Sequence, residues 1–83
     1  HGLSTLWYEN GQKKYESNYV NGKKQGLQTE WYENGQKKVE GKFVNGKLQG
    51  LATKWHENGE MLIQHCFRNG EKVEAYKEGQ PCP

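Results

Sequence analysis

Short segments rich in aromatic and β-branched residues alternate along this chain with Asn-Gly pairs. Six such pairs occur, at 10-11, 21-22, 34-35, 45-46, 58-59 and 69-70. Asn and Gly both tolerate positive φ, so an Asn-Gly pair between segments of this kind predicts a β-hairpin turn. The turns follow one another too closely for helical apolar spacing to develop between them. The pattern therefore predicts an all-β fold.

The same pattern recurs with a period of 24 residues. Residues 7–30 and 31–54 are identical at 17 of their 24 positions. A third unit, residues 55–78, keeps the tryptophan, both Asn-Gly pairs and Phe67, but has Glu74 where the earlier units have Gly26 and Gly50. Repeats of this size stack on their neighbours, and a degenerate last unit is typical of a cap.

We therefore predict an elongated single antiparallel β-sheet of repeated hairpins, formed by residues 1–83 as one repeat domain. It comprises a partial repeat at 1–6, the three full repeats and a tail at 79–83. Residues 1–5 align with residues 25–29, in the middle of a repeat. This alignment predicts that the chain is a fragment and that the natural protein continues upstream.

Two registers compete at the Asn34-Gly35 turn. A two-residue loop places Trp31 opposite Lys38, whereas a three-residue loop with Gly35 in the left-handed conformation places Trp31 opposite Lys37. A slip of one residue moves every side chain to the other face, so the register that gathers apolar residues is favoured. We expect the three-residue loop.

That register predicts four apolar columns on a single face, running across the repeats. They are Trp7, Trp31 and Trp55; Leu3, Leu27 and Leu51; Tyr15, Val39 and Ile63; and Tyr19, Phe43 and Phe67. Gly26 and Gly50 are expected at a bulge or bend after the second Asn-Gly turn.

Composition agrees with a thin architecture. Hydrophobic residues make up 31% of the chain and the mean hydropathy is -1.22, which is too polar for a thick core. The formal net charge of +2 gives no reason to expect a nucleic-acid partner. No catalytic constellation, cofactor-binding motif or metal-ligand set is present in the sequence. We predict a protein that is not an enzyme and carries no cofactor.

Candidate partner-binding residues come from two columns. The indoles of Trp7, Trp31 and Trp55 form either core or an apolar surface that needs a cover. A second column on the opposite face, Tyr8, Tyr32 and His56, offers contact area for another protein or for self-association. The alternative for these three residues is cross-strand packing over lysine stems.

Lysines recur near the turns and offer a second mode of binding. They are Lys13, Lys14, Lys23, Lys24, Lys37, Lys38 and Lys47. They could contact phospholipid head groups of a membrane or an acidic partner. Equally, they could be solvated charges that discourage aggregation between sheet edges.

The two cysteines leave the compartment open. Cys66 and Cys82 could close one disulfide, which fits secretion or the cell envelope, whereas two free thiols fit the cytoplasm. His65 and Cys66 are adjacent on a strand, so their side chains are expected on opposite faces.

The spacing Gly-x-x-x-x-Trp-Tyr-Glu-Asn-Gly, followed by Glu-x-x-(Tyr/Phe)-Val-Asn-Gly-Lys-x-x-Gly, resembles the MORN repeat family. The match rests on residues 26–35 and 40–50 and on their copies one unit away. It is most similar to the variant found in bacterial proteins described as antitoxin components. The resemblance implies a sheet of hairpins that serves as a scaffold for protein contact or dimerisation. It also implies an antitoxin or immunity-like role, with lipid head-group binding as the alternative.

Overall fold

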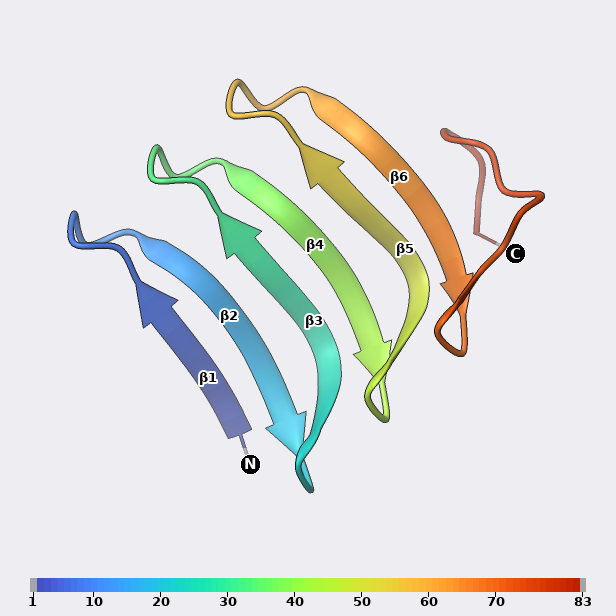
Figure 1. Cartoon of the computed structure of the whole chain (residues 1–83), viewed down its shortest axis with the longest axis horizontal. Coiled ribbons are helices and arrows are strands. Elements are labelled where there is room, and N and C mark those ends of the chain that lie inside the picture. Colours follow the sequence, from blue (N-terminus) through green and yellow to red (C-terminus); the bar gives the residue numbers. More distant parts are fainter. Residues whose placement is uncertain (1, 83) are drawn as a thin grey trace.

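The computed structural model describes residues 2–82, and its strands form one antiparallel sheet in chain order (Figure 1). The strands are β1 (Gly2–Trp7), β2 (Lys13–Val20), β3 (Lys23–Trp31), β4 (Lys37–Val44), β5 (Lys47–Trp55), β6 (Met61–Arg68) and β7 (Glu71–Lys72). The molecule measures 40 × 35 × 14 Å, and its smallest dimension is that of a single sheet with side chains on both faces. The predicted all-β sheet of hairpins is confirmed.

The Asn-Gly pairs form two kinds of turn. At 21-22, 45-46 and 69-70 both residues have positive φ, as at Asn45 (51°) and Gly46 (84°), which is the geometry of a type I′ hairpin turn. At 10-11, 34-35 and 58-59 only the glycine has positive φ, as at Gly35 (89°). There Tyr32 donates its backbone N–H to the Gln36 carbonyl, and the loop is longer.

The longer turn pairs Trp31 with Lys37, as the sequence predicted. However, the next pair is Glu30 with Val39, so Lys38 is an extra residue on β4. This β-bulge shifts the alternation of side chains by one position beyond the turn. In consequence Leu27 lies opposite Lys42 rather than Gly41.

The bulge separates the four predicted apolar columns onto two faces, so the prediction of one shared face was wrong. We name the two faces by these columns. Face A carries Tyr15, Val39, Ile63, Tyr19, Phe43 and Phe67, and face B carries Leu3, Leu27, Leu51, Trp7, Trp31 and Trp55.

Glycines with positive φ lie at the irregularities in β3 and β5, the strands that follow the first two tight turns. Gly26 has φ 88° and Gly50 has φ 92°, and each lies where β3 or β5 has extra residues relative to the preceding strand. L-residues rarely adopt such φ values, and glycine does so without a steric penalty. The predicted bulge at these glycines is confirmed.

Few side chains are fully buried in this thin sheet. Within residues 2–82, Cys66 is the one buried apolar residue, and Ser17, Thr29 and Thr53 are the buried polar ones. Leu3, Leu27 and Trp7 on face B are each more than half exposed. Stability must therefore come from contacts between neighbouring repeats rather than from a central core.

Candidate functional site

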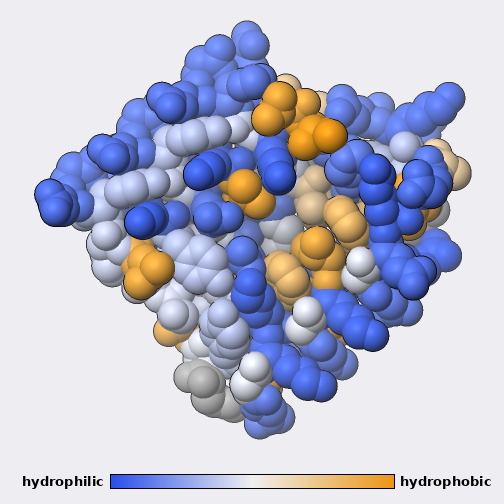
Figure 2. All heavy atoms as spheres, in the orientation of Figure 1, coloured by the Kyte–Doolittle hydropathy of each residue, from blue (hydrophilic) through white to orange (hydrophobic). Residues whose placement is uncertain are grey.

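A shallow apolar depression lies on face A over the second and third repeats. Its volume is about 360 Å3, and its apolar lining comprises Val39, Phe43, Leu48, Ala52, Ile63 and Phe67. Figure 2 shows one broad face of the sheet, where apolar side chains gather over the middle strands inside a hydrophilic rim. The depression draws side chains from β4, β5 and β6, so it exists only when the two repeats are stacked.

A glycine gives the depression its depth. Gly41 is buried on β4, and a Cβ at this position would lie 2.9 Å from Leu48 Cδ2 and 3.7 Å from Ala52 Cβ. The missing side chain therefore lets the leucine lie across the strand. At the third-repeat end His65 lies edge-to-face with Phe67, with ring centroids 6.4 Å apart.

The first repeat gives the same face a polar end. Tyr15, Ser17, Tyr19 and Lys24 occupy the positions that Val39, Gly41, Phe43 and Leu48 hold in the second repeat. The ammonium group of Lys24 lies 5.0 Å from the ring centroid of Phe43, where the two halves of the face meet. Face A thus changes from cationic and hydroxyl-bearing to apolar along its length.

The tyrosine hydroxyls at this end are linked. Partial burial raises the pKa of Tyr15, but hydrogen bonds with Tyr19 and Ser17 and the charge of Lys24 bring it below its ordinary value. The hydrogen bond with Tyr15 raises the pKa of Tyr19. A phenolic hydroxyl both donates and accepts, so these two groups can form hydrogen bonds with a polar partner.

On face B the predicted tryptophan column is interleaved with lysine. Lys13 Nζ lies 6.0 Å from the Trp7 ring centroid and 5.8 Å from that of Trp31, and it forms a 2.8 Å ion pair with Glu16. Lys37 forms the equivalent 2.8 Å pair with Glu40. The Lys13 ammonium group is therefore close to both the Trp7 and the Trp31 indole. The contact of the three indoles with a partner remains a prediction.

The predicted column of Tyr8, Tyr32 and His56 lies at the end of the sheet formed by the longer turns. Tyr8 donates its hydroxyl to the Trp31 carbonyl at 2.6 Å, and Tyr32 donates to the Trp55 carbonyl at 2.7 Å. Each tyrosine thus connects its repeat to the next one. His56 is exposed at the equivalent position of the third repeat. Binding of a partner by these residues is not tested by this geometry and stays a prediction.

Two further ladders between repeats were missed by sequence reasoning. Asn10 and Asn34 each donate a side-chain N–H to the Glu33 or Glu57 carbonyl one repeat later, at 2.9 and 2.8 Å. At the other end of the strands, beside the tight turns, the side chains of Gln25 and Gln49 accept hydrogen bonds from the backbone N–H of Asn45 and Asn69, at 2.9 and 2.8 Å. The signal for these ladders was the exact recurrence of Asn and Gln every 24 residues.

The seven candidate lysines divide between two ends of the sheet. Lys13, Lys14, Lys37 and Lys38 follow the longer turns, whereas Lys23, Lys24 and Lys47 follow the tight turns. Lys14 and Lys38 each lie 5.7 Å over the ring of Tyr8 or Tyr32. These lysines do not form one patch, so their predicted contact with lipid or an acidic partner would involve separate groups.

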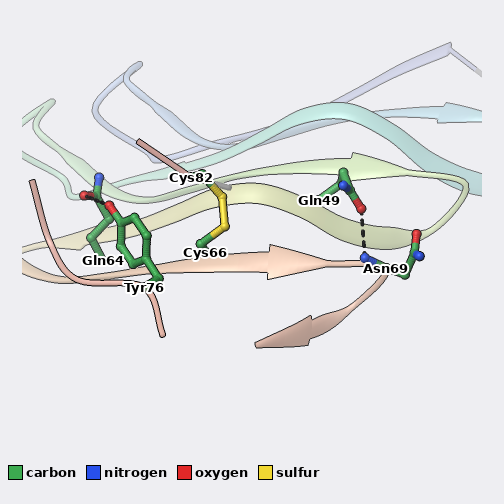
Figure 3. Close-up of a disulfide and its surroundings, with 6 residues drawn as sticks. All are labelled: Gln49, Gln64, Cys66, Asn69, Tyr76 and Cys82. Carbon is green, nitrogen blue, oxygen red and sulfur yellow. Dashed lines mark hydrogen bonds between the residues drawn. A yellow bond between two sulfur atoms is a disulfide. The ribbon is translucent and has the colours of Figure 1, made fainter. Parts of the chain in front are cut away.

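The C-terminal segment is attached to face B of the third repeat through a disulfide (Figure 3). Cys66 and Cys82 are bonded, with Cα atoms 5.6 Å apart, which decides between the disulfide and the two free thiols. Tyr76 donates its hydroxyl to Gln64 Oε1 at 2.8 Å beside this bond. His65 lines face A, so His65 and Cys66 do point to opposite faces as predicted. We call residues 73–82 the strap.

Among residues 2–82, no group of three or more His, Cys, Asp or Glu side chains is arranged to hold a metal ion. The same part of the chain contains no helix long and apolar enough to cross a membrane.

The fold and its two faces define a class of protein, the open sheets of stacked hairpin repeats. This chain belongs to the MORN repeat variant family, whose model matches residues 1–21, 24–45 and 48–69. MORN repeats are non-catalytic binding modules that generally bind proteins or membrane lipids. No curated protein matches the chain, and no solved structure does. The predicted relationship to antitoxin-component proteins receives no support from these comparisons.

Proposed function

We propose that this chain binds another protein through face A, with the apolar depression over the second and third repeats as the centre of the interface. The observation that carries this proposal is the contiguous apolar lining from Val39 to Phe67 on a face over which residues 2–82 form no second layer. Apolar hollows with a polar rim are typical of interaction sites. A face of 40 × 35 Å also exceeds the roughly 800 Å2 per partner that a standard interface buries.

The change in chemistry along face A specifies the partner segment. Apolar side chains of the partner would fill the depression beside Phe43 and Leu48. Hydrogen-bond acceptors or a carboxylate would lie over Tyr15, Tyr19 and Lys24, because these groups supply hydroxyls and a positive charge. The partner is therefore an amphipathic segment with an apolar half and an acidic half.

Substitution of Leu48 by lysine tests this proposal directly. The first repeat has Lys24 at the same position, so the fold accepts Leu48→Lys, while the apolar depression gains a charge. Leu27→Lys is the matched control, because Leu27 is 60% exposed on face B. Immobilised wild-type and Leu27→Lys chains should retain the same partner protein, and Leu48→Lys should lose it. Equal retention by both variants would contradict binding through face A.

Lipid binding is the alternative to this proposal. Flotation with anionic phospholipid vesicles at low and physiological salt separates the two, because salt screens head-group attraction by exposed lysines. We expect no flotation at physiological salt. Flotation of wild-type chain that fails for a variant with Lys14 and Lys38 replaced by alanine would favour the membrane instead.

The narrower antitoxin or immunity-like role is supported by the sequence resemblance alone. Under this hypothesis the partner on face A is a toxin encoded beside the gene. Co-expression with each neighbouring gene product should yield one stable complex, and that complex should be lost with Leu48→Lys. Absence of any complex with the neighbouring products would refute the role and leave protein binding itself untouched.

A further inference from the structure

The strap covers a surface that the first two repeats leave open. Leu51 lies opposite Cys66 on face B and is 40% exposed, whereas its equivalent Leu27, which lies opposite Lys42 of the second repeat, is 60% exposed. The residue equivalent to Cys66 in that repeat, Lys42, is exposed, while Cys66 is fully buried. The third repeat therefore differs from its neighbour by the presence of a cover on one face.

The third repeat is also altered where the strap makes its side-chain contact. In the second repeat the Glu40 carboxylate accepts hydrogen bonds from Lys37 and Thr29. In the third repeat the equivalent residue is Gln64, whose Nε2 donates to Thr53 at 3.0 Å. Its Oε1 remains for the hydroxyl of Tyr76. The hydroxyl of Tyr76 therefore binds a neutral amide oxygen, where the second repeat has the charged carboxylate of Glu40.

Apart from the disulfide, the strap has few contacts with the sheet. Val73 donates its backbone N–H to the Cys66 carbonyl at 2.8 Å, and Tyr76 makes the hydrogen bond to Gln64. Val73, Tyr76 and Cys82 are half-buried, and the residues between them are exposed. Ordering ten residues costs conformational entropy that two hydrogen bonds do not offset. The covalent bond at the end of the strap is therefore what holds it in place.

We propose that the strap is a redox-released cover for face B of the third repeat. A dithiol reductant gives two electrons and two protons to the Cys66–Cys82 bond, which yields two thiols, and the reductant becomes a disulfide. The released strap exposes Leu51 and Gln64, which then extend the open surface of face B from the first two repeats. This inference concerns face B and does not depend on binding through face A.

Amide NMR of the full chain with and without dithiothreitol tests the proposal. In the oxidised chain we expect order parameters near the rigid value of about 0.85 for Val73 and Tyr76, and after reduction below about 0.6. Solvent paramagnetic relaxation of the Leu51 methyl protons should rise to the value measured for Leu27. Signals of β2 to β4 should keep their positions, since the strap does not cover those strands.

Cys82→Ala gives an independent test without reductant. Its strap should be as mobile as that of the reduced wild-type chain, and added dithiothreitol should have no further effect. Strap residues that stay rigid both in the reduced wild-type chain and in Cys82→Ala would overturn the proposal. So would unchanged relaxation of the Leu51 methyl groups after the strap has become mobile, because the strap would then cover nothing.

Discussion

The second and third repeats have nearly the same backbone over their two turns and the strand between them, but different side-chain chemistry. Their tight turns have Asn φ values of 51° and 52°, and the glycines of their longer turns have φ values of 89° and 91°. The strands β4 and β6 have the same length. Yet the Lys37–Glu40 ion pair of the second repeat has no counterpart in the third, where Met61 and Gln64 stand. The turns therefore determine the backbone conformation, whereas the side chains on the surface of the sheet can differ from one repeat to the next.

The two repeats also differ in how each is joined to the residues that follow it. Tyr32 reaches forward from the second repeat to the carbonyl of Trp55, whereas the third repeat has His56 at that position. The third repeat instead turns its last residues back as the strap. The second repeat is therefore connected to the next one through its turn, and the third repeat is connected to the tail that follows it through a disulfide.

Removing the disulfide should have the largest effect on stability. For the loop of about fifteen residues that it closes, the chain-entropy model gives about 3 kcal/mol. We expect Cys82→Ala to lower the free energy of unfolding by about that amount in urea denaturation. The reduced wild-type chain is the control and should unfold at the same midpoint. An unchanged midpoint in both would show that the cross-link does not constrain the unfolded chain.

Replacing Gly50 by glutamate, the residue at the equivalent position of the third repeat, should have the next largest effect on stability. Glu74 stands at this position in the third repeat, and there the regular strand β7 has already ended at Lys72. At Gly50 φ is 92°, so Gly50→Glu should lower the free energy of unfolding by about 1–3 kcal/mol. Gln49→Glu is the control, since it adds the same charge to the neighbouring residue. An equal loss from both variants would assign the effect to charge rather than to backbone conformation.

Removal of one tyrosine hydroxyl should have a smaller effect. Tyr32→Phe leaves the Trp55 carbonyl without its 2.7 Å partner, and we expect a loss of about 1 kcal/mol in thermal or urea unfolding. His56→Phe, at the equivalent exposed position, should change stability by less than about 0.5 kcal/mol. If the two variants lose the same amount, the ladder between repeats does not stabilise the sheet.

The ion pair of the first repeat should have the smallest effect, visible in a pH titration. The hydrogen bond from Lys13 holds the pKa of Glu16 below its ordinary value and outweighs the effect of partial desolvation. A lowered pKa in the fold stabilises it above the unfolded-state pKa of about 4.3, and this contribution is lost as pH falls through the folded-state pKa.

NMR titration of the Glu16 carboxyl carbon measures this pKa. Lys13→Ala should raise it toward the ordinary value, whereas Lys14→Ala should leave it unchanged, because Lys14 lies over Tyr8 instead. A pKa that does not respond to Lys13→Ala would contradict the role given to the ion pair.

Sequence periodicity was sufficient to predict the strands, their order and the pairing of Trp31 with Lys37. The four apolar columns were wrongly assigned to one face because of a single residue, Lys38, which is extra on β4. The 24-residue periodicity shows that Lys38 recurs in kind at Lys14, but it does not show that this residue forms a bulge. The contacts of Tyr8 and the strap depend on distances across repeats. The spacing of two cysteines allowed a disulfide but could not decide that it forms.

The most direct test of the two-faced sheet is a set of nuclear Overhauser contacts. A two-faced sheet predicts contacts from Leu48 methyl protons to Gly41 and Ala52 on face A, and from Trp31 to the Lys13 side chain on face B. It predicts none between the Trp31 indole and Val39 methyl groups. Strong Trp31–Val39 contacts would place the four apolar columns on one face and contradict both the bulge and the binding surface built on it.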